Sequence, residues 1–288
     1  MDIVLGAHQY GKAEVRLVHV VRHGDRHQLT DLTVSVALAG DLADTHRTGD
    51  NAKVLPTDSQ KNTVYAFARR HGVGEIEDFG LRLARHFVES QAVITRATVH
   101  VQQHGWDRLG EHSFARSGAE TRTATVTVDG SGAVVVSGLT GMVLMNTTAS
   151  EFHGFVRDEY TTLPDAHDRV LATAVDGRWR HATSESDDWA ASFTQARRHL
   201  VEAFVGTHSL SLQQTLYAMG QRVLEHRPEI VEVRMSLPNR HHFLVDLAPF
   251  GLDNPNEVFY AADRPYGLIE GAVRRDDAPR WEESWWQA

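Results

Sequence analysis

The densest group of polar side chains suited to chemistry lies in residues 50–70, DNAKVLPTDSQKNTVYAFARR. Pro56 favours extended backbone at the residue before it, so any preceding structure ends there. Thr57 and Gln60 have the spacing of a capping box, and apolar residues then recur at helical intervals, which predicts that a helix begins here. The first turn of a helix has unpaired backbone N–H groups that can hold an anionic or polar ligand. The polar side chains of that turn are Thr57, Asp58, Ser59 and Lys61. The alternative is a capped amphipathic helix that binds nothing.

A second chemical pattern is VRHGDRH in residues 21–27, which contains the RHGxR signature of histidine phosphatases. In those enzymes the histidine is phosphorylated and arginines bind the phosphate, and the pair His167-Asp168 would imitate their distal residues. The phosphatase motif leaves a strand for a loop and a helix, whereas β-rich sequence continues here. A polar hairpin turn at Gly24-Asp25 is therefore the alternative interpretation.

The 18 histidines suggest metal binding as a third possibility. His19, His23 and His27, and likewise His100 and His104, would align on a helix, but their segments have the pattern of strands and a turn. No His-Glu-x-x-His motif is present, so we expect no metal site. The absence of cysteine excludes disulfides, thiol nucleophiles, iron–sulfur clusters and zinc sites that need cysteine.

Several segments together resemble the urate oxidase family. Residues 57–69, TDSQKNTVYAFAR, follow an Asp-Asn pair and are similar to the family signature. The same likeness occurs, in family order, in QYGK (9–12), FHGFVRDEYTTL (152–163), DRVL (168–171), SLQQTLY (211–217) and SLPNRHHF (236–243). The similarity extends from Lys12 to about Ile269 and is more specific than any single motif.

The resemblance implies that Lys12 and Thr57 form a proton-handling pair and that His241 completes the relay. A lysine acts as a base only when burial or nearby positive charge lowers its pKa, and a neighbouring hydroxyl can pass the proton on. Without the family, Lys12 would be taken as a surface lysine at the start of a strand.

The resemblance also implies a set of substrate contacts. The implied urate-binding residues are Thr57, Asp58, Phe152, Leu163, Arg169, Leu212, Gln213, Asn239 and Ile269. Arg169 would offer a planar fork of donors, Gln213 a carboxamide that donates and accepts, and Phe152 a flat apolar face for the purine. Asn239, with Thr57, would hold dioxygen or water. Without the resemblance, Arg169 would be a solvated arginine and Gln213 a glutamine at a helix start. Phe152 would be a core aromatic and Asn239 a turn asparagine.

The family reaction needs no cofactor, because deprotonated urate gives electrons directly to dioxygen. The implied products are 5-hydroxyisourate and hydrogen peroxide, and the protein supplies orientation, proton transfer and charge stabilisation. The implied assembly is a homotetramer whose pockets lie between subunits, with Lys12, Thr57 and Asp58 on one side and Arg169 among the residues on the other. A purine- or pterin-binding oligomer without turnover is the non-catalytic alternative.

The elements that must position these residues alternate between strands and helices. In the first half, residues 13–21 and 29–38 predict a β-hairpin, and the helix after Pro56 is followed by a second helix. The apolar stripe of that second helix is Ile76, Phe79, Leu83 and Phe87. Strands are expected at 93–106, 121–128 and 134–144.

The second half repeats this order. A strand is expected at 174–181, then a helix from Trp189 with Asp187-Asp188 as cap candidates, and a helix with a Ser211–Gln214 capping box that Pro228 ends. Residues 230–237 and 242–247 predict a second hairpin, and residues from 248 onward are expected to be rich in loops.

Pattern and composition predict an α+β fold, with repeats at residues 1–132 and 133–288, the second including the C-terminal tail. The resemblance specifies a tandem tunnelling fold (T-fold), with helices outside an antiparallel sheet that closes into a barrel on oligomerisation. A net charge of −9 argues against nucleic-acid or membrane surfaces. With no signal peptide and no C-terminal peroxisomal address apparent, we expect a cytoplasmic bacterial enzyme.

Overall fold

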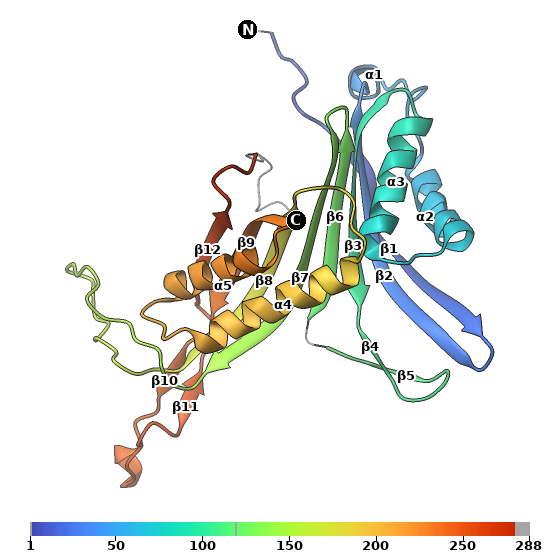
Figure 1. The fold of residues 1–288 in the computed structure, drawn as a ribbon. Helices are drawn as coiled ribbons and strands as arrows, with labels where there is room; N and C mark the ends of the chain where they lie inside the picture. Colours follow the sequence, from blue (N-terminus) through green and yellow to red (C-terminus); the bar gives the residue numbers. More distant parts are fainter. Residues whose placement is uncertain (1, 119, 280–288) are drawn as a thin grey trace. The chain divides into compact units, whose positions relative to one another are not determined.

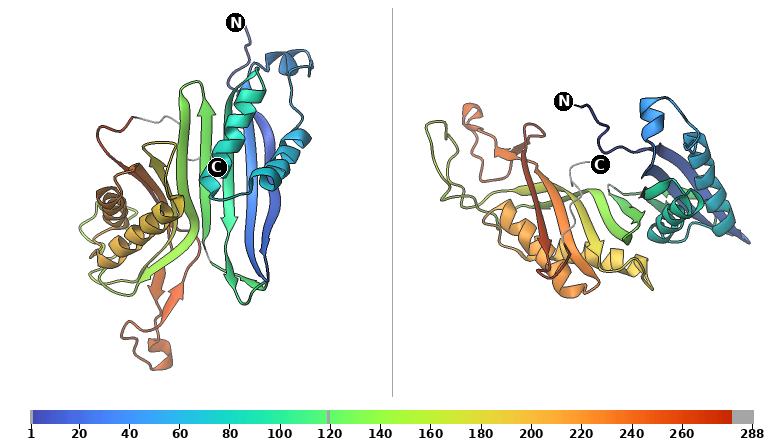
Figure 2. Two further views of the ribbon diagram at one scale, coloured as in Figure 1. Left: turned by 45° about the vertical axis from the view of Figure 1, so that its right-hand side comes forward. Right: turned by 90° about the horizontal axis from the view of Figure 1, so that it is seen from above.

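The computed structural model describes residues 2–118 and 120–279. The chain divides into two compact units, the first formed by Met1–Val143 and Thr183–Phe193 and the second by Leu144–Ala182 and Thr194–Ala288. Each unit combines antiparallel strands with helices (Figures 1 and 2), which confirms the predicted α+β class. The residues at the extreme C-terminus, on which the expected absence of a peroxisomal address depends, lie outside the described ranges.

The first unit contains five long antiparallel strands in the order β1-β2-β3-β6-β7. Their bounds are β1 Tyr10–His23, β2 Arg26–Gly40, β3 Ile94–His104, β6 Thr121–Asp129 and β7 Gly132–Asn146, whose last three residues belong to the second unit. The other elements are α1 Ala43–Arg47, α2 Thr57–His71, α3 Ile76–Ser90 and the short pair β4 Trp106–Arg108 and β5 Phe114–Arg116.

Helix α3 covers strands β3 and β6 with the apolar stripe that its sequence predicts. Ile76, Phe79, Leu83 and Phe87 are completely buried. Burying a side chain of this size contributes about 1.5–3 kcal/mol relative to exposure. Helix α2 lies on β1 and buries Val64 among the same core residues.

The capping box predicted at Thr57 is wrong, although the helix begins there. Thr57 is already the first helical residue, Pro56 occupies the N-cap position, and no side chain caps this helix end. The Pro56 carbonyl accepts the Gln60 N–H at 3.1 Å, and the buried Gln60 side chain donates to the Leu55 carbonyl at 3.3 Å. The proline ring fixes a backbone conformation that suits the residue before a helix. The first helical residue is therefore Thr57, one position earlier than the predicted capping box implies.

The predicted first hairpin is confirmed. Strands β1 and β2 pair as far as His23 with Arg26, so that Gly24 and Asp25 form the turn, and Gly24 has a positive φ of 57°. The phosphatase interpretation of this segment is wrong, because no helix follows the motif. The helical alignment of His19, His23 and His27 also fails, because all three lie on paired strands.

The second unit contains a three-stranded antiparallel arrangement in the order β8-β9-β12, with helix α5 and all but the first five residues of helix α4. The bounds are β8 Leu171–His181, α4 Trp189–Gly206, α5 Leu212–His226, β9 Ile230–Asn239, β10 His242–Leu244, η1 Ala248–Phe250, β11 Phe259–Ala261 and β12 Gly267–Arg274. Helix α5 packs on β9 and β12, and its stripe of Leu212, Leu216, Met219 and Val223 is buried.

Both helix starts predicted in this half are confirmed. Ser211 is the N-cap of α5, where its Oγ accepts the Gln214 N–H at 3.2 Å, while Gln214 Oε1 accepts the Leu210 N–H at 2.8 Å. The Asp188 carboxylate accepts the Ala191 N–H at 2.8 Å at the start of α4.

The hairpin predicted for residues 230–247 is wrong. Strand β9 pairs on one edge with β8 and on the other with β12, whereas β10 pairs with β11. The residues from 248 onward, expected to be rich in loops, also contain β11 and β12. Both edges of β9 pair with strands that are distant in sequence. The order of the strands along the chain does not predict this pairing.

Among the described residues, no helix has both the length and the apolar character needed to cross a membrane.

Candidate functional site

The strand that carries Lys12 is irregular where the lysine lies. The pairing of β1 with β2 shifts register between Lys12 and Val15, and Glu14 in this bulge has a positive φ of 56°. Gly11 is required beside it, because an added Cβ would lie 1.8 Å from the carbonyl oxygen of Val36. The bulge aims the partly buried Lys12 side chain differently from a regular strand.

Tyr10 connects this strand to the entrance of α2. Its hydroxyl donates to the Leu55 carbonyl and accepts the Leu55 N–H, both at 3.1 Å. Burial raises the pKa of Tyr10, so the hydroxyl keeps its proton. Lys12 lies two residues after Tyr10 and Thr57 two residues after Leu55, so this double contact holds the two predicted proton-handling residues in one unit.

The first turn of α2 carries unpaired backbone N–H groups together with side chains of both charges. Thr57 and its two successors have N–H groups that the helix cannot pair, and the Thr57 hydroxyl caps nothing. The exposed Asp58 carboxylate receives Lys61 Nζ at 2.5 Å and Asn62 Nδ2 at 3.0 Å. The hydrogen bond from Lys61 lowers the pKa of Asp58, and the charge of Lys12 adds to this effect. Lys12 and the start of α2 therefore share an electrostatic environment.

In the second unit, Phe152 and Arg169 lie together in the segment before β8. Phe152 exchanges two backbone hydrogen bonds with Ala166, at 2.7 and 2.9 Å. Arg169 donates through its backbone N–H to the Ser150 carbonyl at 2.9 Å and through Nε to Ser150 Oγ at 3.3 Å. The guanidinium carbon is 5.3 Å from the centre of the Phe152 ring. An aromatic face and a half-buried planar cation are thus adjacent, and burial lowers the pKa of Arg169.

His241 lies beside the end of β9 with Asn239. Its Nε2 accepts the Gly267 N–H at 3.3 Å, which requires that nitrogen to be unprotonated. Burial and then the charge of Arg169 lower the pKa of His241, which favours the neutral ring. A Cβ at Gly267 would lie within 4.0 Å of Ile269, His241 and Asn239, so these three side chains surround it.

Asn239 is buried because β9 is paired on both sides there, with Thr173 of β8 and Gly267 of β12. Leu212 and Gln213 form the first turn of α5, the leucine buried and the glutamine exposed. Leu163 is also exposed, in the loop before β8.

The predicted residues therefore form two groups. Lys12, Thr57 and Asp58 belong to the first unit, and the second unit holds Phe152, Leu163, Arg169, Leu212, Gln213, Asn239, His241 and Ile269. Contacts within each unit bring together Lys12 with the start of α2, Phe152 with Arg169, and His241 with Asn239 and Ile269.

Four supporting residues are missed by sequence reasoning: Tyr10, Gly11, Ser150 and Gly267. Tyr10 and Gly11 lie inside the QYGK segment, which is the one signal that points to them. A cluster of Glu151, His153 and His167 is missed as well; their possible metal-ligand atoms lie within 4.8 Å of one another. The Glu-x-His spacing of residues 151–153 is its only local signal.

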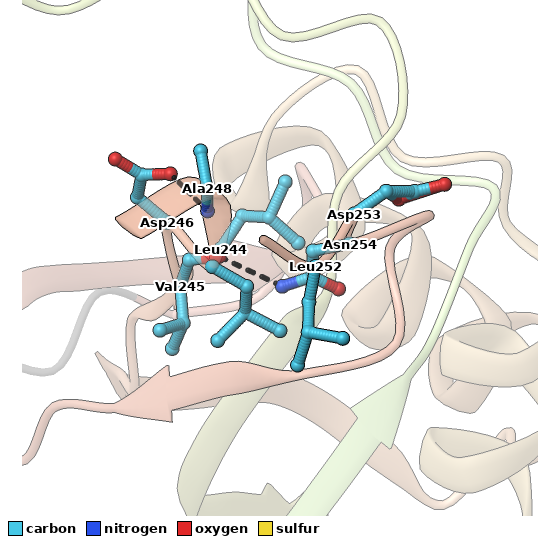
Figure 3. Close-up of a pocket in the computed structure, with 8 residues that line it drawn as sticks. Leu244, Val245, Asp246, Ala248, Leu252, Asp253 and Asn254 are labelled. Carbon is cyan, nitrogen blue, oxygen red and sulfur yellow. Dashed lines mark hydrogen bonds between the residues drawn. The ribbon is translucent and has the colours of Figure 1, made fainter. Parts of the chain in front are cut away.

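A hollow near β10 lies in a different part of the second unit (Figure 3). It is lined by residues 244–248 and 252–254, where Asn254 Nδ2 donates to the Val245 carbonyl at 2.9 Å. None of the predicted site residues lines it. The hollow is formed by a loop closed by its own side chains, so it is not the site that the motifs predict.

Comparison with known proteins gives a consistent result. The family model described as Uricase matches residues 8–127 and 135–270. The chain is 53% identical to a uricase of Arthrobacter globiformis over 285 residues, 97% of this chain and 94% of that protein. It is 35% identical to a uricase of Oryctolagus cuniculus, over 92% of this chain and 93% of that protein.

The structural comparison agrees. The crystal structure of uricase from Arthrobacter globiformis matches with a TM-score of 0.94 and 53% identity, over 97% of this chain and 98% of that chain. The chain therefore belongs to the uricase family, and it is an enzyme of urate oxidation.

Proposed function

We propose that this chain converts urate, dioxygen and water to 5-hydroxyisourate and hydrogen peroxide without a cofactor. The observation that supports urate binding is the half-buried guanidinium of Arg169, which Ser150 holds beside the Phe152 ring. A fork of N–H donors next to an aromatic face suits a flat purine anion, because it binds adjacent oxygen and nitrogen atoms of one edge while the ring stacks. Gln213 binds another edge of the purine.

Proton transfer is assigned to Lys12, Thr57 and His241. Lys12 takes a proton from urate through the Thr57 hydroxyl, which is available because it does not cap α2. The resulting electron-rich anion passes electrons to dioxygen, and a peroxide forms at the ring carbon. Hydrogen peroxide then leaves to give dehydrourate, and water adds to the same ring carbon. The neutral His241, whose pKa is lowered, accepts a proton during the attack of water.

Dioxygen and then water are held over the purine by Asn239 and Thr57. The buried position of Asn239 at the end of β9 supports this role, because a carboxamide fixed by strands on both sides orients a small ligand. Asp58, Leu163, Leu212 and Ile269 complete the pocket walls.

We further propose a homotetramer in which tandem T-fold repeats, residues 1–132 and 133–288, close into barrels. Each pocket then takes Lys12, Thr57 and Asp58 from one subunit and the Phe152 and Arg169 group from another. Two observations support this assembly: the predicted residues fall into two groups in separate units of the chain, and each group is ordered by contacts within its own unit. A monomer would then be inactive.

The test follows the loss of urate ultraviolet absorbance together with hydrogen peroxide, using metal-stripped protein. Wild type is expected to turn over, and Lys12→Ala and Arg169→Ala are expected to lose at least about 100-fold in kcat/KM, which corresponds to about 2.7 kcal/mol. The matched controls are Lys53→Ala and Arg222→Ala, whose surface charges pair with Asp41 and Glu202. Absence of turnover by the folded tetramer would contradict the proposal. Titration with urate would then test the alternative that the protein binds urate without converting it.

A further inference from the structure

Three histidines surround one glutamate in the segment before β8 and just after α4. The Glu151 carboxylate lies 2.6 Å from His208 Nε2 through one oxygen and 2.9 Å from His153 Nε2 through the other. His167 Nδ1 lies 4.0 Å from that second oxygen, and the rings of His153 and His167 are 4.6 Å apart. All four residues belong to the second unit.

Backbone hydrogen bonds place this cluster. Glu151 N–H donates to the Ser209 carbonyl at 2.7 Å, and Ser209 N–H donates to the Ala149 carbonyl at 2.9 Å. The two bonds between Phe152 and Ala166 bring the segment of His167 alongside that of His153. Three stretches of chain are therefore joined at their backbones where the imidazoles converge, so the convergence does not depend on the side chains alone.

The dimensions suit a tetrahedral ion. Ligands at 2.0–2.1 Å from Zn²⁺ stand about 3.4 Å apart, and the candidate atoms of Glu151, His153 and His167 all lie within 4.8 Å of one another. Closing the difference requires the side chains to move, which their exposure permits, since His167 is 74% and His153 40% exposed. The same exposure leaves a path for an ion to enter, while the glutamate, at 21%, is the sheltered ligand.

We propose that Glu151, His153 and His167, with His208 as a fourth ligand, bind one divalent transition-metal ion of the Zn²⁺ class. Imidazole nitrogen with one carboxylate favours Zn²⁺, Ni²⁺ or Cu²⁺, whereas Mg²⁺ and Ca²⁺ prefer sites made of oxygen. The competing account is a metal-free cluster in which His153 and His208 hydrogen-bond to the carboxylate and His167 lies beside them.

The ion would stabilise the fold of this segment and take no direct part in the chemical reaction. Phe152 lies between two of the ligands, and Arg169 follows His167 by two residues. An ion that ties residues 151–153 to residue 167 would hold the aromatic face and the guanidinium in their observed relation. Binding to the folded chain alone would raise its melting temperature, by an amount that grows with the logarithm of the free ion concentration once this exceeds the dissociation constant. This site does not depend on the proposed reaction.

The experiment titrates chelator-treated full-length protein with Co²⁺, followed by visible absorption, and with Zn²⁺, followed by calorimetry. Wild type is expected to bind one equivalent per chain, with the intense visible bands of tetrahedral Co²⁺ and a rise in melting temperature. His167→Ala and Glu151→Gln are each expected to weaken binding at least tenfold. The matched controls are His23→Ala, at the exposed β1–β2 turn, and Glu159→Gln, an exposed glutamate in the same loop.

Two results overturn the proposal. One is the absence of stoichiometric binding by folded wild type, which would establish the metal-free cluster. The other is that His23→Ala weakens ion binding as much as His167→Ala does. This would show that the ion binds to scattered surface histidines and not to this cluster. Circular dichroism checks that each variant is folded. Urate turnover is measured separately on the same stripped samples, so failure of this site and failure of the proposed reaction are distinguishable.

Discussion

Tyr10 and Leu55, 45 residues apart, exchange two hydrogen bonds through a single hydroxyl, which donates to the Leu55 carbonyl and accepts its N–H. This contact joins the bulged start of β1 to the segment that enters α2. Lys12 and Thr57 each follow one of the two partners by two positions, so Tyr10 joins the two segments that carry them.

Tyr10→Phe should therefore impair both stability and turnover. Removing the hydroxyl leaves two backbone groups of Leu55 without that partner in a partly buried place, at a cost of about 1–3 kcal/mol. We expect a lower urea midpoint, and a fall in kcat that exceeds the change in KM, because the proposed proton transfer would depend on the spacing of Lys12 and Thr57. Tyr65→Phe is the control, since its hydroxyl donates to the Arg16 carbonyl from the exposed side of α2. Equal effects of the two substitutions would contradict a positioning role for Tyr10.

Arg169→Lys tests whether shape or charge matters at the proposed urate clamp. Lysine keeps the positive charge but loses the planar fork and the Nε contact with Ser150. We expect KM for urate to rise about 10- to 100-fold, corresponding to about 1.4–2.8 kcal/mol. Steady-state kinetics measure this, with Arg222→Lys on the surface of α5 as the control. An unchanged KM would mean that charge alone suffices there.

The pH dependence of stability should show the influence of His104. Burial, followed by the charges of Arg16 and Arg116, lowers the pKa of His104, and its Nε2 lies 2.7 Å from Thr33 Oγ1. The unfolded chain then binds this proton more readily than the folded chain does, so the free energy of unfolding rises with pH through this window. The contribution is complete above the ordinary pKa of about 6.5 and is lost as the pH falls through the lowered value.

Urea unfolding between about pH 5 and pH 7.5 measures this slope. We expect His104→Gln to make it shallower, and the exposed control His23→Gln to leave it unchanged. Some slope will remain, because burial also lowers the pKa of His86 and His199. A variant with the full wild-type slope would show that His104 has no part in it.

Gly220 and Gly206 form a matched pair for packing in the second unit. A Cβ at Gly220 would lie 2.6 Å from Val273 Cγ2, where α5 crosses β12, whereas a Cβ at Gly206 at the end of α4 meets nothing within 4 Å. We expect Gly220→Ala to destabilise by about 1–3 kcal/mol through overpacking. Gly206→Ala should be neutral or stabilise by up to about 1 kcal/mol, because alanine restricts the unfolded chain. Thermal and urea unfolding of both variants give the comparison, and a neutral Gly220→Ala would mean that α5 shifts freely.

The local elements follow from residues that lie close together in the sequence. The stripe of Ile76, Phe79, Leu83 and Phe87 predicts α3, and the whole stripe is buried. The Ser211–Gln214 box marks the start of α5, and the turn at Gly24 and Asp25 joins β1 to β2. These signals succeed because helical periodicity, capping and tight turns depend on residues only a few positions apart. The motifs identified the family for the same reason, since each is a short contiguous run.

Other features depend on partners that are distant in sequence and are visible only in the folded chain. Strand β9 pairs with β8 and β12 in place of its neighbour β10, because both of its edges are completed by strands elsewhere in the chain. Gln60 turns to the Leu55 carbonyl and not to Thr57, because Pro56 has already provided the helix entrance. His208 reaches Glu151 across 57 residues, and no local spacing indicates that approach. Local propensity is decided by neighbours in sequence, whereas strand pairing and side-chain convergence are decided by which distant surfaces the folded chain brings together.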